Sequence, residues 1–359
     1  MRESILDYKG AFSDKKYCGI PRRKHPFQDT EDPLPINPFV GDEAKIVNSK
    51  AFRRLTGKPQ VFPNPSNPYV RNRQSHSYEA LSIGAVISDF LGLNTDLCRA
   101  GLLGHDIGHV PFGHHGEEVI TDLSAENGKK KVFNHAVYGV VVAQKIERKD
   151  EISLNLTYPT LQCMLNHSRK GHELAVNPKL SLECAVVMYA DKLSYTFADI
   201  NDAVRMGRLR IHDLPEVFDF SKSHRVLTTQ CITELVKEST EAGVISFQKS
   251  ETAQAFLELR EWMYKNVYHE INWDLQEAVL KKDFEFFAED QRFKDIDPLI
   301  MLTLLTDSQA LCLADAIRSN RPVGDYVIEE SGIFEMKKYI LGKKIDYCNP
   351  DLDEEDFLY

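Results

Sequence analysis

The sequence predicts a mainly α-helical protein, and three observations support this fold class. Apolar residues recur at spacings of three and four along several segments, which places them on one face of a helix. Strand-like alternation of apolar and polar residues is scarce, and no internal repeat is present. A chain of 359 residues is long enough to bury a sizeable core, in one large domain or two.

The composition is that of an ordinary globular enzyme, with 42% apolar and 27% charged residues. A net charge of −10 makes the whole protein a poor electrostatic match for nucleic acid, although its 44 lysines and arginines leave a local basic patch open. The seven scattered cysteines form no CxxC pair, which argues against a disulfide framework and a thiolate zinc site and favours a reducing compartment. No signal peptide or membrane span is recognisable, so we expect a cytoplasmic protein without a membrane partner.

Proline-rich segments mark where helix is not expected. Residues 20–39 contain five prolines and residues 59–68 contain four more. Proline fixes φ and disfavours helix in the residue before it, so both segments should be extended or turning. We assign residues 1–40 to an extended N-terminal arm.

The first long helix is predicted to begin near His76 and to end at Gly92, because glycine adopts a left-handed helix cap without strain. Its inward-facing stripe follows spacings of four, three, four and three residues: His76, Ala80, Ile83, Ile87 and Phe90.

A second helix is expected from about Thr95 to Asp106, and three small residues in it permit close approach of a neighbour: Ala100, Gly101 and Gly104. Glycine-rich turns should follow as far as Gly116. A third helical region surrounds residues 133–147, after a polar loop at residues 124–131.

Two further segments carry apolar stripes at helical spacing. The first, within residues 181–202, consists of Leu182, Val186, Tyr189, Leu193, Phe197 and Ile200. The second consists of Phe256, Leu259, Met263, Val267 and Ile271. This second stripe also offers an apolar face for self-association.

Histidine is concentrated in one part of the chain, since eight of the 12 histidines fall between residues 76 and 172. The densest stretch is HDIGHVPFGHHGEE at residues 105–118. A lone His-Asp pair is commonly a hydrogen-bonded surface pair, but five further ionisable groups among glycines favour a chemical site. His105 and Asp106 at a helix end can offer a nitrogen and a carboxylate to one divalent ion, and these ligand types do not by themselves name the metal.

A second constellation is YADKLSYTFAD at residues 189–199. Asp191, Tyr195 and Asp199 follow one another at every fourth position and share a helix face, with Lys192 one step round. A solvated helix exterior would also explain this spacing. The apolar residues at 185–188 and 190 instead favour a helix buried nearly all round, in which a carboxylate needs a partner such as a metal.

These motifs resemble the HD-domain superfamily, and within it the deoxynucleoside triphosphate triphosphohydrolases related to bacterial dGTPase. The signature is His76, then His105-Asp106, then Asp191. Longer strings narrow the match: FRRLTGKPQVF (52–62) with RNRQSHS (71–77), HDIGHVPFGHHGE (105–117) and YADKLSY (189–195). The resemblance covers about residues 40–210. It implies an all-α HD phosphohydrolase domain at residues 41–225, with residues 226–359 forming additional C-terminal helices packed on it.

The resemblance also implies a role for each site residue. One divalent cation per subunit, Mn²⁺ or Mg²⁺ before Fe²⁺, Ni²⁺ or Zn²⁺, would be bound by His76, His105, Asp106 and Asp191. The catalytic group would be His114, its carboxylate partner Glu117, and His109 beside them. The substrate-binding group would be Arg73, His135 and Lys192 at the phosphates, with Tyr195 and Asp199 at the sugar.

Two departures from the family pattern concern the sugar and the base. Thr56 stands where many relatives have a glutamine that helps hold the deoxyribose. The nearest equivalent of the family's C-terminal Met-Thr-Asp string is GDYVIEESGIF at residues 324–334. Recognition of the nucleoside is therefore expected to differ more than the metal site.

The implied activity is metal-dependent hydrolysis of deoxynucleoside triphosphates, dGTP and others, to deoxynucleoside and inorganic triphosphate. The resembling family forms homo-oligomers, so a hexamer or tetramer is expected. One alternative is an HD phosphohydrolase acting on a monophosphate, cyclic or pyrophosphorylated nucleotide. Another is a nucleic-acid-binding regulator with a ligand-sensing HD site and weak single-strand binding, although no basic stripe interleaved with aromatics supports it.

Overall fold

The computed structural model of the protein describes residues 4–19, 21–25, 37–63, 67–129, 131–148, 152–168, 174, 177–319 and 332–352. The predicted α-helical fold class is confirmed, since these residues form helices and no sheet beyond two isolated β-bridges. The α-helices are α1 (Pro38–Val47), α2 (Lys50–Arg54), α3 (Arg73–Leu91), α4 (Thr95–Gly104), α5 (Gly113–Glu126), α6 (His135–Val141), α7 (Tyr158–Asn166), α8 (Leu182–Arg205), α9 (His224–Ala242), α10 (Glu251–Met263), α11 (Asp274–Glu289), α12 (Pro298–Thr303), α13 (Asp307–Arg318) and α15 (Ile333–Ile340). Short π-helical turns extend α6 (Val142–Ile146) and α10 (Tyr264–Tyr268). None of the described helices is both long and apolar enough to cross a membrane.

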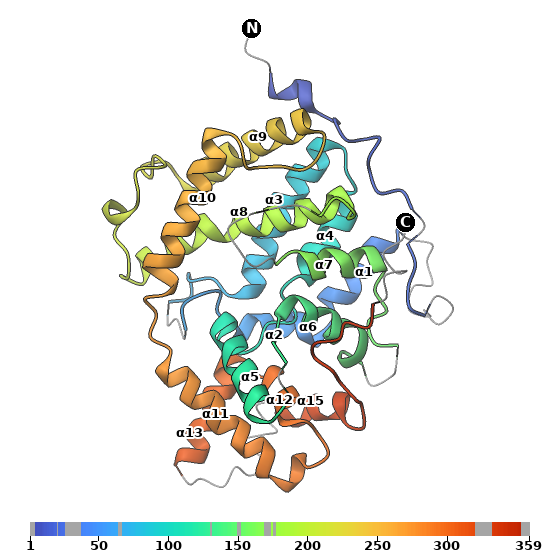
Figure 1. Ribbon diagram of the computed structural model, residues 1–359, viewed down its shortest axis with the longest axis vertical. Helices are drawn as coiled ribbons and strands as arrows, with labels where there is room; N and C mark the ends of the chain where they lie inside the picture. The colour runs from blue at the N-terminus through green and yellow to red at the C-terminus, as the bar shows by residue number, and fades with distance from the viewer. Residues whose placement is uncertain are drawn as a thin grey trace.

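Helices α3, α4, α7 and α8 pack against one another at the centre of the molecule (Figure 1). Glycines make their approach close. A Cβ at Gly84 of α3 would lie 2.3 Å from a Leu102 methyl carbon of α4, and one at Gly101 would lie 2.7 Å from Cys163 of α7. Gly101 and Gly104, two of the three small residues predicted to admit a neighbour to the second helix, therefore do so, and the neighbour is α7.

Helix α3 has well-defined ends. Asn72 and Ser75 form a capping box at its start, and Gly92 ends it in a left-handed conformation with φ of +78°. Its predicted inward face is buried at Ala80, Ile83 and Ile87. Both ends thus agree with the sequence prediction to within a few residues.

The N-terminal segment is more ordered than an extended arm. Residues 4–19 include a short 3₁₀ turn at Ile5–Tyr8 that packs on α9, and the backbone N–H groups of Gly10 and Phe12 donate to the carbonyls of Phe90 and Leu91. Helix α1 already begins at Pro38, before the predicted limit at residue 40. Residues 26–36, which carry three of the arm's five prolines, lie outside the described residues.

The glycine-rich stretch after α4 is less irregular than predicted. Turns were expected as far as Gly116, but α5 begins at Gly113. Glycine disfavours helix by about 1 kcal/mol relative to alanine, and burial of Val119, Ile120 and Leu123 in the core offsets that cost. Gly116 also permits a close approach, because a Cβ there would lie 1.9 Å from the carbonyl oxygen of Pro111.

Two apolar cores run through the described chain, and each mixes segments from before and after residue 225. One joins residues of α3, α4 and α8 to α9 and α10, and the other joins α5 and α6 to α11, α12 and α13. In Figure 1 the first group lies in the upper half and the second in the lower half. The division at residues 40 and 225 stays a prediction.

The apolar stripe of residues 256–271 was expected to offer a face for self-association, but it faces the interior of this chain. All five stripe residues are buried in this chain's own core: Phe256, Leu259, Met263, Val267 and Ile271. This face is therefore not available for self-association, and the stripe gives no support to the expected oligomer.

Asp283 of α11 is a buried carboxyl whose titration should make stability depend on pH. Its side chain is fully buried, and neither oxygen has a hydrogen-bond partner among the described residues. Burial raises its pKa to about 9. A raised pKa means that the folded state holds a proton that the unfolded chain releases above about pH 4, so stability falls as pH rises from there toward about 9.

We therefore expect Asp283→Asn to be more stable than the parent at pH 8 and to lose this advantage toward pH 5. The difference in the free energy of unfolding should grow by up to about 1.4 kcal/mol per pH unit. Urea denaturation at several pH values measures it, with Glu285→Gln on the exposed side of α11 as the control. A difference that does not change with pH would show that Asp283 does not titrate in this way.

Candidate metal centre and active site

Four side chains from three places in the chain converge at the centre of the helical core. Helix α3 carries His76, the residues after α4 carry His105 and Asp106, and α8 carries Asp191. The Nε2 atom of His76 lies 3.0 Å from Asp191 Oδ1 and 3.3 Å from His105 Nε2. His105 Nε2 lies 3.3 Å from Asp106 Oδ1 and 3.6 Å from Asp191 Oδ1.

The donor atoms of this cluster suit a divalent cation. His105 Nδ1 donates to the carbonyl of Leu102 at 2.6 Å, so in the neutral ring Nε2 carries a lone pair that faces the cluster. Two imidazole nitrogens and two carboxylate oxygens that are almost fully buried form a ligand set for Mn²⁺, Mg²⁺ or a similar ion. His76, His105 and Asp106 place their ligand atoms within 4.8 Å of one another.

Neighbouring basic groups lower the pKa of both carboxylates. Burial raises the pKa of Asp106, but His105, His109 and the Arg73 guanidinium, 3.1 Å away, bring that pKa well below its usual range. Burial likewise raises the pKa of Asp191, and the Lys192 ammonium at 3.0 Å with His76 lowers it by more. Both groups can therefore act as anionic ligands.

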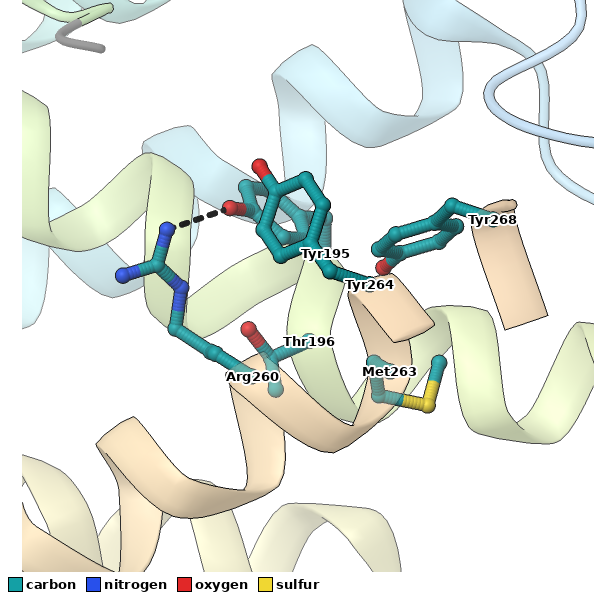
Figure 2. A pocket seen from close by; sticks show the side chains of 6 residues that line it. All are labelled: Tyr195, Thr196, Arg260, Met263, Tyr264 and Tyr268. Atoms are coloured by element: carbon teal, nitrogen blue, oxygen red, sulfur yellow. Dashed lines mark hydrogen bonds between the residues drawn. The ribbon is translucent and has the colours of Figure 1, made fainter. Parts of the chain in front are cut away.

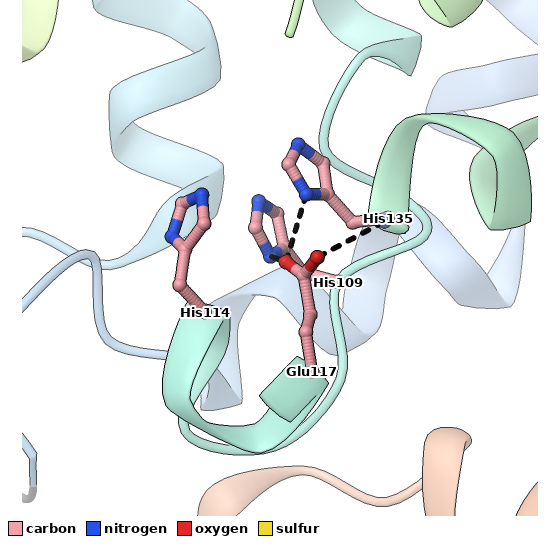
Figure 3. Close-up of side chains that lie close together, drawn as sticks. All are labelled: His109, His114, Glu117 and His135. Carbon is pink, nitrogen blue, oxygen red and sulfur yellow. Dashed lines mark hydrogen bonds and ion pairs between the residues drawn. The ribbon is translucent and has the colours of Figure 1, made fainter. Parts of the chain in front are cut away.

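A second cluster lies against the first and consists of His109, His114, Glu117 and His135 (Figure 3). His135 Nδ1 donates to Glu117 Oε1 at 2.8 Å, and His109 Nδ1 lies 3.3 Å from the same oxygen. The rings of His109 and His135 are stacked with centroids 3.8 Å apart. His109 Nε2 lies 3.2 Å from Asp106 Oδ1, which links the two clusters.

His114 is the solvent-exposed member of the second cluster. Its ring stands on the first turn of α5, edge-on to His109 at 5.2 Å (Figure 3). The surrounding protein lowers its pKa, and nearby His109 and His135 lower it further, while Glu117 acts in the opposite direction. Glu117 was expected to orient His114, but its carboxylate hydrogen-bonds His135 instead.

A third feature is a narrow recess, shown in Figure 2. It lies beside the metal cluster, because the rings of Tyr195 and His76 have centroids 6.5 Å apart. It is lined by Tyr195, Thr196, Arg260, Met263, Tyr264 and Tyr268. Arg260 donates to the Tyr195 hydroxyl at 3.1 Å, and the Tyr268 hydroxyl donates to Asp199 Oδ2 at 2.8 Å. Helix α10 and its π turn thus close the recess over α8.

The chain is similar to one known domain family and to several known proteins. Residues 73–196 match the HD domain family model. A "deoxyguanosinetriphosphate triphosphohydrolase-like protein" of Clostridium tetani is 33% identical over 86% of this chain and 83% of its own length. Proteins with the same name from Caldanaerobacter subterraneus subsp. tengcongensis and Desulfatibacillum aliphaticivorans are 32% and 36% identical, over 89% and 68% of this chain and 88% and 70% of their own lengths. The chain belongs to this family. The predicted family membership is thereby confirmed, and it places the protein among the HD-domain phosphohydrolases.

In this family member the predicted site residues form one continuous site. Each of the four predicted metal ligands has a ligand atom 3.0–3.6 Å from that of another. The predicted catalytic residues His109, His114 and Glu117 lie beside them, with His109 in contact with Asp106. Arg73 and Lys192 each contact one of the carboxylates, and Tyr195 and Asp199 follow along α8. Their individual roles stay predictions. Of the string at residues 324–334, residues 324–331 lie outside the described residues.

Sequence reasoning missed three residues of the site. His167, at the end of α7, lies 3.1 Å from His135 through its Nε2 atom, and Arg260 and Tyr268 come from the C-terminal region. For His167 the available signal was its place within the histidine-rich segment. No pattern in the sequence pointed to Arg260 or Tyr268 as a site residue, because each lies next to a residue of an apolar stripe that is typical of any core helix.

Buried polar contacts hold the loop that joins the two clusters in this dGTPase-like chain. Phe112 adopts a left-handed conformation with φ of +61°, which is strained for a residue with a large side chain. Its N–H donates to Asp307 Oδ1 of α13 at 3.1 Å, and Lys58 Nζ donates to the carbonyl of His109. Asp307 therefore positions the backbone next to His114.

Asp307→Ala should lower kcat by about tenfold with a smaller change in KM, because leaving a buried N–H unpaired costs about 1–3 kcal/mol and frees the loop. Asp307→Asn keeps an oxygen acceptor and is the matched control. Hydrogen exchange at Phe112 should accelerate in the Ala variant and stay close to the parent in the Asn variant. Equal exchange in all three proteins would remove Asp307 from this role.

Proposed function

We propose that this protein hydrolyses deoxynucleoside triphosphates in a metal-dependent reaction that releases a deoxynucleoside and inorganic triphosphate. The observation that carries the proposal is the contact through Asp106 and His109 between two clusters, one suited to a divalent cation and one rich in imidazoles. The names of the relatives support the same substrate class.

We assign the divalent cation, Mn²⁺ or Mg²⁺, to His76, His105, Asp106 and Asp191. When bound, the ion supplies Lewis-acid polarisation of the α-phosphoryl oxygen. Arg73 and Lys192 add positive charge at the edge of this cluster, and His109 offers a further contact, so that the anionic triphosphate is held and oriented.

Proton transfer is assigned to His114. Hydrolysis adds water to the α-phosphorus and breaks its bond to the 5′-oxygen, which must gain a proton as it leaves. The lowered pKa of His114 means that the ring is neutral at physiological pH. The ring would pass the proton that the attacking water loses on to the departing 5′-oxygen. Glu117 contributes through its negative charge and through its hold on His135 and His109.

We assign the nucleoside to the side of the metal cluster where Tyr195 and Asp199 lie, along the narrow recess between α8 and α10. The Arg260 bond fixes the Tyr195 ring, and Tyr268 holds Asp199, so an added 2′-hydroxyl would meet a crowded wall. Thr56 is exposed and its hydroxyl donates to the carbonyl of Arg53, so it does not replace the glutamine of many relatives. We infer that the enzyme accepts several deoxynucleotides rather than dGTP alone.

The test is chromatography of products from the four deoxynucleoside triphosphates and GTP, each with added Mn²⁺ or Mg²⁺, together with kcat/KM for each. The expected products are a deoxynucleoside and intact triphosphate, with poor cleavage of GTP. Release of pyrophosphate or single phosphates, or turnover of only monophosphate or cyclic nucleotides, would overturn the proposed reaction. A preference for dGTP above about 10³-fold would overturn the broad substrate range, since strict readout needs polar groups that lose their partners with a wrong base.

A further inference from the structure

Cys163 of α7 and Cys184 of α8 bring two free thiols close together in the core. Their Sγ atoms lie 2.9 Å apart, and both residues are at most 2% exposed. Two non-bonded carbon atoms make their best contact at about 3.5–4.0 Å, and sulfur is larger than carbon. A disulfide bond is about 2.05 Å long. The separation of this pair therefore lies between an ordinary contact and a bond.

The packing of α4, α7 and α8 holds the two thiols in place (Figure 1). A Cβ at Gly101 of α4 would lie 2.7 Å from the Cβ of Cys163 and 3.7 Å from its Sγ, so α4 leaves the Cys163 side chain little room to turn away. The third buried thiol nearby has another partner, because Cys98 of α4 donates through its Sγ to the carbonyl of Glu183 at 3.8 Å. Cys163 and Cys184 are thus the pair whose sulfur atoms face each other.

Cys184 is the member of the pair that a small reagent reaches more easily. It lies in the first turn of α8, and residues 177–182 before it are all partly or fully exposed. The ends of helices open locally more readily than their middles. Burial raises the pKa of the Cys163 thiol well above its usual range, and the neighbouring Cys184 raises it further, so Cys163 is a slow nucleophile. Oxidation is therefore expected to begin at Cys184.

We propose that Cys163 and Cys184 are a redox modification site, at which a small hydroperoxide such as hydrogen peroxide forms a reversible disulfide between α7 and α8. The peroxide oxidises the Cys184 thiol to a sulfenic acid and releases one water. The Cys163 sulfur then attacks the Cys184 sulfur, so that the S–S bond forms as the S–O bond breaks and a second water leaves. The two thiols lose two electrons and two protons in total, and the peroxide is reduced to two waters. A low-molecular-weight thiol reverses the modification by thiol–disulfide exchange.

Both cysteines lie on helices that lead to the candidate active site. Cys184 precedes Asp191 by seven residues on α8, and Cys163 precedes His167 by four at the end of α7, so the members of each pair share a helix face. Closing the two sulfurs from 2.9 Å to about 2.05 Å moves them by about 0.9 Å. A displacement of about 1 Å in an active site can slow a reaction by about 10²-fold. The disulfide is therefore expected to slow hydrolysis, a consequence that rests on the proposed function.

The test exposes the folded full chain to hydrogen peroxide, removes the peroxide, alkylates the remaining thiols in denaturant and maps cross-linked peptides by mass spectrometry without reduction. The parent should show a Cys163–Cys184 cross-link that dithiothreitol removes. Cys163→Ala should lose this cross-link, whereas Cys231→Ala, which removes a buried thiol of α9, should keep it. Turnover of the parent should fall by between a few-fold and about 10²-fold on oxidation and recover with dithiothreitol, and turnover of Cys163→Ala should fall less.

Free thiols at both positions in the oxidised parent would overturn the proposal, and would mean that the contact is only a hydrogen bond between the thiols. A cross-link from either residue to a different cysteine would also overturn it. The peptide map of the parent decides the question even if Cys163→Ala fails to fold. Unchanged turnover in the cross-linked parent would overturn the link to the active site. Absence of deoxynucleotide turnover in the reduced parent would contradict the proposed function alone, because the peptide map does not depend on activity.

Discussion

Asp106→Asn should leave the protein without bound metal and without measurable nucleotide hydrolysis. Asp106 supplies a carboxylate oxygen beside His105 and His109, and it belongs to two of the four groups of described side chains that could hold an ion. Asparagine keeps the size of the side chain but loses the anionic charge that a divalent ion needs. We expect a loss of at least about 10³-fold in kcat/KM, because the reaction depends on the metal.

We also expect Asp106→Ala to lose metal and activity, but Asp106→Asn is the better test. Arg73 is buried and forms its ion pair with Asp106 at 3.1 Å. Removing the whole carboxyl leaves a buried charge without its partner, at a cost of about 3–5 kcal/mol, so Asp106→Ala could lose metal simply by unfolding. The asparagine oxygen can still accept from Arg73.

Elemental analysis of the purified variant measures the metal, and circular dichroism measures the fold. Asp122→Asn, at an exposed position of α5, is the control for removal of a carboxylate. A folded Asp106→Asn protein that keeps the parent's full metal content would exclude Asp106 as a ligand.

His114→Ala should keep its fold and its metal and yet lose about 10²–10⁴-fold in kcat, the range typical for a proton-transfer group. His114 is exposed on the first turn of α5, so its removal leaves no cavity in the core. It is also not one of the four predicted metal ligands. Metal content and activity should therefore separate in this variant, whereas in Asp106→Asn they fall together.

His115→Ala is the matched control, since the neighbouring ring points elsewhere and stacks on Trp273 with centroids 5.2 Å apart. Its turnover should stay within a few-fold of the parent. Activity of His114→Ala within about tenfold of the parent would exclude a proton-transfer role. Rescue by added imidazole would strengthen the assignment, because a free base can occupy the space that the ring leaves.

The sequence alone determined the helices whose stripes are long and regular. Residues of α3 and α8 repeat at helical spacing over four turns or more, and spacing of this kind reports which face is buried. The start of α5 could not be predicted from such a stripe, because Gly113 and Gly116 disfavour helix locally. Burial of Val119, Ile120 and Leu123 in the core compensates for that cost.

The central residues of the site could also be predicted from the sequence. Adjacent His105 and Asp106 among glycines, and a carboxylate at Asp191 in an otherwise apolar helix, are local patterns that already suggest a buried ion. The resemblance supplied His76, His114 and Glu117 through motifs of fixed spacing. In the structure these residues lie together, as such motifs require.

Tertiary structure alone decided the partners that come from distant segments. His167 lies opposite His135 across 32 residues of chain, Tyr268 reaches Asp199 across 69, and Asp307 reaches Phe112 across 195. Each of these residues sits in a stretch whose own pattern is that of an ordinary helix or helix end. Periodicity reports only the face that a helix buries, whereas the identity of the group it meets depends on how the helices pack, so these contacts could be known only from the assembled fold.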